Sequence, residues 1–156
     1  MRLSTKGRYA VTAMLDLAIH ERNGPVTLAD ISHCQSISLS YLEQLFSKLR
    51  RKSLVRGVRG PGGGYKLARP ASEITIASII AAVDEQVDAT CGGAQPCDDD
   101  QACLTHELWC GLSRQIYQFL DSVTLASFLS RPSVQAVIRR QDRDYHRPGI
   151  PPVTLA

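Results

Sequence analysis

The chain has 156 residues, 44% of them hydrophobic and 21% charged, which is the composition of a globular domain that buries its own core. No apolar run is long enough to cross a bilayer and the N-terminus lacks a signal sequence, so we expect a cytoplasmic protein with no membrane partner. The net charge of +3 is unevenly divided, since residues 1–70 carry twelve Lys and Arg against four Asp and Glu, and this basic half favours a polyanionic partner.

Hydrophobic periodicity predicts three helices in the first third of the chain. The first covers residues 2–22 and ends before the Gly-Pro pair at 24–25. Thr27 fits the N-cap of a second, short helix that runs to about residue 34. The SISLS segment then forms a turn and caps a third helix, which continues through residues 41–52.

The segment LVRGVRGPGGGYKLAR, residues 54–69, has two short runs with β-branched or aromatic residues around a glycine-proline turn. That pattern predicts a β-hairpin. Three helices followed by a hairpin is the order of a winged helix-turn-helix. Beyond it we expect a helix over residues 75–86 capped by Thr75, a long amphipathic helix over 104–123, and a short helix beginning in TLASFL.

The third helix has an apolar and a polar face at about 100° per residue. The side chains expected to face the core are Leu39, Leu42, Leu45, Phe46 and Leu49. The opposite stripe, spaced i, i+4, i+7 and i+11, consists of Ser40, Gln44, Ser47 and Arg51. Short polar side chains of this kind read base edges in a major groove, and Glu43 on the shoulder of the stripe suits contact with a cytosine amine. Ser38 and Ser40 lie at the helix N-terminus, a position that favours a bound phosphate. The alternative interpretation of the whole stripe is an ordinary solvated helix face.

The glycine-rich turn of the hairpin places Arg59 at its tip, with Arg56 three residues earlier. An arginine on a thin loop suits a narrow minor groove, whose negative potential attracts it. A nucleotide-binding loop is disfavoured, because the turn lacks the Gly-Lys-Ser/Thr ending of a P-loop.

The segment CGGAQPCDDDQACLTH, residues 91–106, has the spacing C-x5-C-x5-C-x2-H. In a cytoplasmic chain, clustered cysteines indicate metal or redox chemistry rather than disulfides. Zinc sites prefer pairs of cysteines separated by two to four residues, whereas an iron–sulfur cluster needs four protein ligands and tolerates wider spacing. The spacing therefore leaves both possibilities open and slightly favours the cluster.

Five segments resemble the iron–sulfur-sensing members of a family of dimeric winged-helix bacterial transcription factors. They are MRLSTKGRYAVTAMLDLA, ISLSYLEQLFSKLR, VRGPGGGY, AAVDEQVDATC and CLTHELW, and the match runs from residue 1 to about residue 130. The resemblance implies a regulator without enzymatic activity, a homodimer that binds a palindromic operator in double-stranded DNA.

The resemblance also implies a [2Fe–2S] cluster, supplied by the cluster assembly machinery. Its implied ligands are Cys91, Cys97, Cys103 and His106. The loaded dimer would repress the operon for cluster assembly, and the cluster-free form would bind a second class of sites. The residues placed where such proteins contact or discriminate DNA are Ser38, Ser40, Glu43, Gln44 and Arg59.

The resemblance further implies that the long helix pairs two subunits. The apolar stripe expected to do so comprises Leu108, Leu112, Ile116, Leu120 and Val123, and ordinary intrachain core is its alternative. The expected fold class is thus mainly α with a small β-hairpin. Residues 1–70 form the winged helix-turn-helix, residues 71–130 the cluster-binding loop and dimerisation helix, and residues 139–156 a disordered tail.

Three other functions stay open at this point: a DNA-binding regulator with a structural zinc, a nitric-oxide or redox sensor of the same family, and a small electron carrier. Cys110 lies one helical turn beyond His106 and competes with it as fourth ligand, although the resemblance favours His106. We expect Cys34 to be a small buried hydrophobe. His20, His33 and His146 are expected at the surface.

Overall fold

The computed structural model describes residues 4–83 and 104–145, so Cys91, Cys97, Cys103 and the rest of the expected cysteine loop lie outside the described residues. The elements in chain order are α1 (Thr5–His20), η1 (Glu21–Asn23), α2 (Leu28–Gln35), α3 (Leu39–Arg51), β1 (Val55–Val58), β2 (Gly64–Leu67), η2 (Ala71–Glu73), α4 (Ile76–Ala82), α5 (His106–Ser122), α6 (Leu125–Leu129) and α7 (Pro132–Tyr145). The predicted fold class, mainly helical with one antiparallel hairpin, is confirmed.

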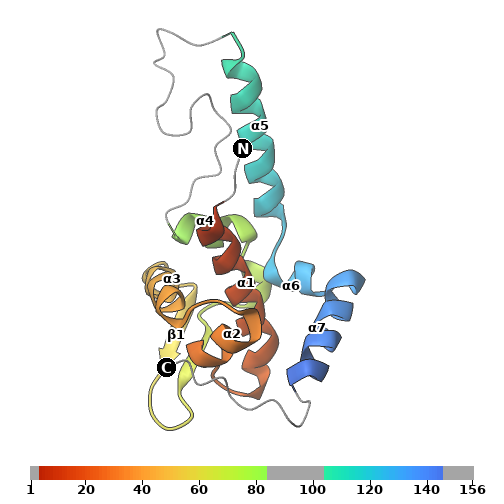
Figure 1. Ribbon diagram of the computed structural model, residues 1–156. Helices are drawn as coiled ribbons and strands as arrows, with labels where there is room; N and C mark the ends of the chain where they lie inside the picture. The colour runs from red at the N-terminus through yellow and green to blue at the C-terminus, as the bar shows by residue number, and fades with distance from the viewer. Residues whose placement is uncertain (1–3, 84–103, 146–156) are drawn as a thin grey trace.

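Helix α1 lies at the centre of the body and contacts α2, α3, α4, α6 and β2 (Figure 1). Its buried side chains meet those of the surrounding helices in one hydrophobic core. The largest side chains in this core with no exposed surface are Met14, Leu17, Ile31, Leu42, Phe46, Leu49, Ile74, Ile79 and Leu125. The apolar periodicity of the sequence therefore produces a single core that orients α3 and the hairpin together.

Side-chain caps begin three of the helices where the sequence predicted them. Thr27 accepts a hydrogen bond from the Asp30 N–H at 3.1 Å at the start of α2. Ser38 and Thr75 do the same for the third residue after them, starting α3 and α4. Such caps satisfy N–H groups that a helix leaves unpaired, so these boundaries are local properties of the sequence.

The two strands of the hairpin pair with each other, and the hairpin is also hydrogen-bonded to the body. Its strands pair in the register Val55↔Leu67 to Val58↔Gly64, and the turn between them contains Gly60 and Gly62 at φ +99° and +69°. Those angles are unfavourable for a side-chain-bearing residue. Beyond the hairpin, the Val26 N–H donates to Tyr65 O at 3.0 Å and the Tyr65 N–H to Val26 O at 2.7 Å. The loop before α2 thus continues the small sheet and orients the hairpin.

Helix α5 extends away from the body, and none of its residues is buried (Figure 1). At its base the chain re-enters the core, where an antiparallel bridge joins Thr75 to Thr124. The Ile76 N–H donates to Val123 O and the Leu125 N–H to Ile74 O, both at 2.9 Å. The start of α4 and the start of α6 are therefore held together by backbone hydrogen bonds.

Three expectations need correction. Leu39, predicted to face the core, is 43% exposed, because it is the first residue of α3 and lies at the edge of the core that buries Leu42 one turn further on. Residues 139–145, predicted as part of a disordered tail, are helical in α7, which packs against α6. Val123 of the expected dimerisation stripe is buried in the core of its own chain, and Leu120 packs against that core.

Among the residues that the structure describes, no helix combines the length and the apolar character needed to span a membrane.

Candidate nucleic-acid interface

Helices α2 and α3 are joined by a tight turn that fixes their relative direction. Ser36 ends α2 in the left-handed conformation at φ +54° and ψ +41°. Ile37 then inserts into the core, while the Ser32 hydroxyl donates to Ile37 O at 2.6 Å. A short helix, a left-handed turn residue and a second helix on a common core constitute a helix-turn-helix, in which the second helix is presented outward.

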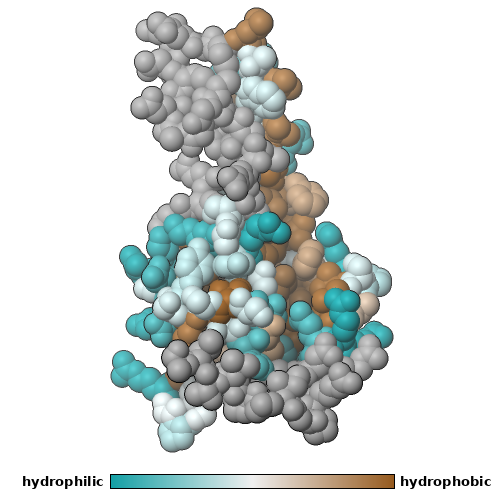
Figure 2. All heavy atoms as spheres, in the orientation of Figure 1, coloured by the Kyte–Doolittle hydropathy of each residue, from teal (hydrophilic) through white to brown (hydrophobic). Residues whose placement is uncertain are grey.

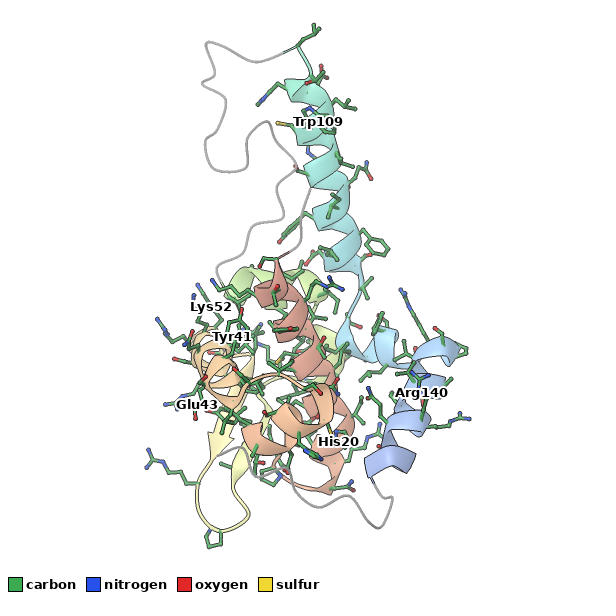
Figure 3. All side chains as sticks on the ribbon, in the orientation of Figure 1. His20, Tyr41, Glu43, Lys52, Trp109 and Arg140 are labelled. Atoms are coloured by element: carbon green, nitrogen blue, oxygen red, sulfur yellow. The ribbon has the colours of Figure 1, made fainter. Side chains whose placement is uncertain are left out.

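The outward face of α3 carries the polar stripe expected from the sequence. All of its members are exposed, namely Ser40, Gln44, Ser47 and Arg51. Glu43 is also exposed and points away from the body (Figure 3). Ser38 differs, because its hydroxyl oxygen accepts a hydrogen bond from the Tyr41 N–H at 3.3 Å and so caps the helix. The hydroxyl hydrogen of Ser38 is still free to point outward as a donor.

The first turn of α3 is anchored on α1 by two aromatic rings. Tyr41, half-buried and labelled in Figure 3, meets Tyr9 edge-to-face with ring centroids 5.9 Å apart. Pairs of this geometry stabilise a contact beyond simple area burial. The stripe is thus presented by a rigid helix rather than by a loop.

Beside α3 the hairpin presents arginines. Arg59 is exposed at the glycine turn, and Arg56 is exposed on β1. Together with Arg50, from the last turn of α3, they line a surface hollow of about 530 Å³ between the helix and the hairpin. Arg50 and Arg56 were not among the DNA-binding residues predicted from the sequence. Only the packing of β1 against the end of α3 brings them together, and no spacing in the sequence signals it.

His106, the only expected cluster ligand in the described ranges, is the first residue of α5. Its Nδ1 atom is buried and has no hydrogen-bond partner among those residues, whereas its Nε2 atom lies 3.3 Å from Cys110 Sγ. A buried ring nitrogen without a partner fits a metal ligand, because burial without a bond is costly. Within residues 4–83 and 104–145 no three His, Cys, Asp or Glu side chains gather closely enough to hold a metal ion.

Helix α5 exposes apolar side chains in both its N-terminal and its C-terminal half. Leu108 is 62% exposed and Phe119 61%, and Leu112 and Tyr117 are exposed as well. Figure 2 shows hydrophobic residues along this projecting helix. Ile116 is half-buried. Val123 is buried in the intrachain core and Leu120 packs against it, so the members of the stripe outside that core are Leu108, Leu112 and Ile116.

His20, predicted to be a surface residue, is 35% exposed and also takes part in a polar network that the sequence did not predict. Its Nδ1 atom lies 3.1 Å from Asp16 Oδ1, and its Nε2 atom 3.6 Å from Asp142 Oδ1 on α7. Burial lowers the pKa of His20, but the Asp16 charge and hydrogen bonds, with Asp142, outweigh it and raise the pKa. The i, i+4 spacing of Asp16 and His20 was the available signal.

Cys34 is half-buried on α2. Burial, followed by the charges of Asp16, Asp30 and Asp142, raises the pKa of its thiol to about 11. Since the thiolate is the reactive form, Cys34 carries an unreactive thiol at neutral pH, although it is half-buried rather than buried as expected.

A helix-turn-helix with an exposed polar second helix, joined to an arginine-bearing glycine hairpin on the same side, defines a winged-helix DNA-binding protein. No described feature of this face resembles a catalytic centre.

The comparisons with known proteins agree. Residues 3–131 match Rrf2, described as an iron-dependent transcriptional regulator. The chain is 62% identical over 144 residues to the ORF2 regulator of Azotobacter vinelandii, covering 92% of this chain and 88% of that protein. It is 57% identical over 148 residues to the HTH-type transcriptional regulator IscR of Serratia proteamaculans (strain 568), covering 94% and 90%.

The solved structure of T. potens IscR has 39% sequence identity and a TM-score of 0.69, covering 83% of this chain and 86% of that one. The chain therefore belongs to the Rrf2 family. Like the relatives named above, it is a transcription regulator that binds DNA and is not an enzyme.

Proposed function

We propose that this chain is a homodimeric, iron–sulfur-responsive transcription regulator. The observation that carries the proposal is His106 Nδ1 at the start of α5, which is buried and has no hydrogen-bond partner among the described residues. His106 lies three residues after the last cysteine of the C-x5-C-x5-C-x2-H sequence. The similarity to IscR regulators over most of the chain supports the same function.

The residues that would hold a [2Fe–2S] cluster are Cys91, Cys97, Cys103 and His106. When bound, the cluster supplies a redox-active group whose presence depends on iron supply and oxidative damage. His106 contributes a neutral nitrogen in place of a fourth thiolate. Because His106 begins α5, ligation connects the cysteine segment directly to the helix proposed to pair the subunits.

DNA reading is assigned to α3 and the wing. Ser40, Gln44, Ser47 and Arg51 face the base edges of a major groove, with Ser38 at the helix start. Glu43 accepts from a cytosine amine or rejects other bases, and so discriminates between sites. Arg59 enters the adjacent minor groove. Two copies of α3 in a homodimer meet the half-sites of a palindrome roughly one helical turn apart.

In the proposed regulation, the loaded dimer represses the operon for cluster assembly. When clusters are scarce, the cluster-free protein leaves that operator and occupies a second class of sites. The cluster assembly machinery is the donor that closes this feedback loop.

The deciding experiment is anaerobic purification followed by visible absorption spectroscopy and assays for iron, sulfide and zinc. A coloured protein with equal iron and sulfide contents, about two of each per chain, is the expected result. A colourless protein that contains zinc supports the structural-zinc alternative and contradicts the proposal. Gel shifts with cluster-loaded and cluster-free protein on duplexes selected from a random pool then test whether the cluster changes the preferred DNA site. An electron carrier would select no DNA sequence from the pool.

A further inference from the structure

We propose that the hollow between the end of α3 and the hairpin is a phosphate-binding site, in which Arg50 and Arg56 together hold one phosphate of the DNA backbone. The inference rests on DNA binding by this chain and is independent of the iron–sulfur cluster. The sequence-derived DNA contacts include neither arginine.

The lining of the hollow is suited to an anion. It comprises the four residues of β1 together with Arg50, Arg59, Gly64 and Tyr65, and none of these is acidic. Neither Arg50 nor Arg56 forms an ion pair with a carboxylate in the part of the chain that the structure describes. Guanidinium groups present paired N–H donors that match phosphate oxygens, so two of them beside one hollow favour a bidentate contact.

The hairpin carries a like-charge pair that is unfavourable in the free protein. Arg56 is directly opposite Lys66 in the antiparallel register, so the two side chains leave the same face of the sheet. Like charges in this relation destabilise a strand pair. A bound phosphate would turn the repulsion into attraction, which indicates that the pair serves binding rather than folding.

The elements that present the two arginines are rigid. Arg50 follows the fully buried Leu49, and the Leu54 N–H donates to Leu49 O at 3.1 Å, which ties the end of α3 to the start of β1. The Tyr65 ring meets the buried Phe46 ring edge-to-face with centroids 5.0 Å apart. The hollow is thus formed before DNA arrives, which lowers the entropic cost of binding.

The geometry of duplex DNA explains why a phosphate belongs at this position. A sugar-phosphate strand separates every major groove from the neighbouring minor groove. A protein that places α3 in one groove and the Arg59 turn in the other must straddle that strand. The surface between the two elements is this hollow, so the separating strand passes over Arg50 and Arg56.

The test uses the full-length chain and a duplex that the wild-type protein itself selects from a random-sequence pool. The variants are Arg50→Ala, Arg56→Ala and the double variant. Arg140→Ala, which removes the same charge from α7 on the far side of the body, is the matched control (Figure 3). We expect the double variant to bind at least about tenfold more weakly, with the slope of log K against log salt reduced by about one.

A second measurement locates the contact. Methylphosphonate groups, which are uncharged, replace the phosphates of the duplex one at a time. At one position per half-site the wild-type protein should lose affinity while the double variant loses none. Equal methylphosphonate profiles for the two proteins, or a double variant that binds like Arg140→Ala, would overturn the proposal.

Failure of this inference is distinguishable from failure of the proposed function. Phosphate contacts are independent of sequence, so the loss and the reduced slope should also appear on a random duplex. A wild-type protein without a cluster would refute the proposed function and leave these measurements valid.

Thermal unfolding shows whether the variants fold, and Arg56→Ala should be at least as stable as wild type because it removes the repulsion with Lys66.

Discussion

Asp16 is a buried carboxylate that connects the central helix α1 to α2 of the helix-turn-helix. It is 2% exposed, and its Oδ2 atom accepts a hydrogen bond from Gln35 Nε2 at 2.6 Å. Gln35 is the last residue of α2, immediately before the left-handed Ser36. The direction in which the chain leaves α2 for α3 is therefore partly set by a charge on α1.

We expect Asp16→Ala to lower the free energy of unfolding by about 1–3 kcal/mol, because it leaves Gln35 and His20 without their shared acceptor. The measurement is urea denaturation followed by circular dichroism. Asp142→Ala, which removes the more exposed carboxylate near His20, is the comparison and should cost less than about 1 kcal/mol. Equal losses for the two variants would contradict the role given to Asp16.

The raised pKa of His20 makes stability depend on pH in a defined direction. Since the folded-state pKa is above the unfolded value of 6.5, the contribution of protonated His20 is fully present below pH 6.5. It is lost as pH rises through the folded-state value. We therefore expect the thermal unfolding midpoint of the wild type to fall more than that of His20→Gln as the pH rises from 6.5 through the folded-state pKa. Parallel plots of midpoint against pH for the two proteins would refute the interaction.

The contact between His106 and Cys110 predicts which of them would bind the proposed cluster. Cys110 Sγ lies against Nε2, and Nδ1 is buried without a partner among residues 4–83 and 104–145, so we propose His106 as the ligand. His106→Ala should change the visible spectrum and reduce the iron content of anaerobically purified protein. Cys110→Ala should keep the absorption of wild type. The opposite pair of results would make Cys110 the fourth ligand.

At the scale of single elements, α5 divides into two parts with different surroundings. Its C-terminal end belongs to the body, since Leu120 packs against the core and Val123 is 8% exposed. Its N-terminal half exposes Leu108 and Leu112. The uniform apolar stripe in the sequence does not distinguish the two parts, because periodicity gives the side of a helix and not what lies beside each turn.

Glutamate substitutions along α5 should therefore have different effects. Leu108→Glu with Leu112→Glu should convert the proposed dimer to a monomer with little change in the thermal unfolding of the body, because charged residues are disfavoured in an apolar interface. Leu120→Glu should instead destabilise the fold. Sedimentation equilibrium and thermal unfolding measure the two effects. A double variant that remains dimeric would exclude this face as the interface.

The hairpin depends on Gly64 for its attachment to the body. A Cβ atom at Gly64 would lie 2.5 Å from Val26 O, in the bridge that joins Val26 to Tyr65. Gly64→Ala should reduce the free energy of unfolding by about 1–3 kcal/mol. Gly57→Ala in the paired strand is the control, since a Cβ there meets nothing within 4 Å. Similar unfolding curves for the two variants would show that the close approach is unimportant.

For the whole molecule, the sequence predicted those features whose interacting residues are close together in the chain. Caps such as Thr27 and Thr75, and the glycine turn of the hairpin, act over a few residues, so their patterns identified helix starts and the wing. The polar stripe of α3 followed from helical angles alone. The cluster ligands came from resemblance and remain predictions.

The features that escaped sequence analysis join residues far apart in the chain. Gln35 and Asp16 are separated by 19 positions, and the Leu67 N–H donates to Glu21 Oε2 across 46. The hollow between α3 and the hairpin likewise exists only once β1 packs against the helix. Leu39 shows a limit of helical periodicity: its angle places it on the same side of α3 as the buried Leu42, yet its side chain is 43% exposed.

The bridge between Thr75 and Thr124 has a consequence for a chain that is cut. Because backbone hydrogen bonds and the packing of α6 on η2 and α1 fasten the C-terminal portion to the N-terminal one, a single protease cleavage between α4 and α5 would yield two peptides that stay associated. The nicked molecule would migrate as one species under native conditions and as two in denaturant.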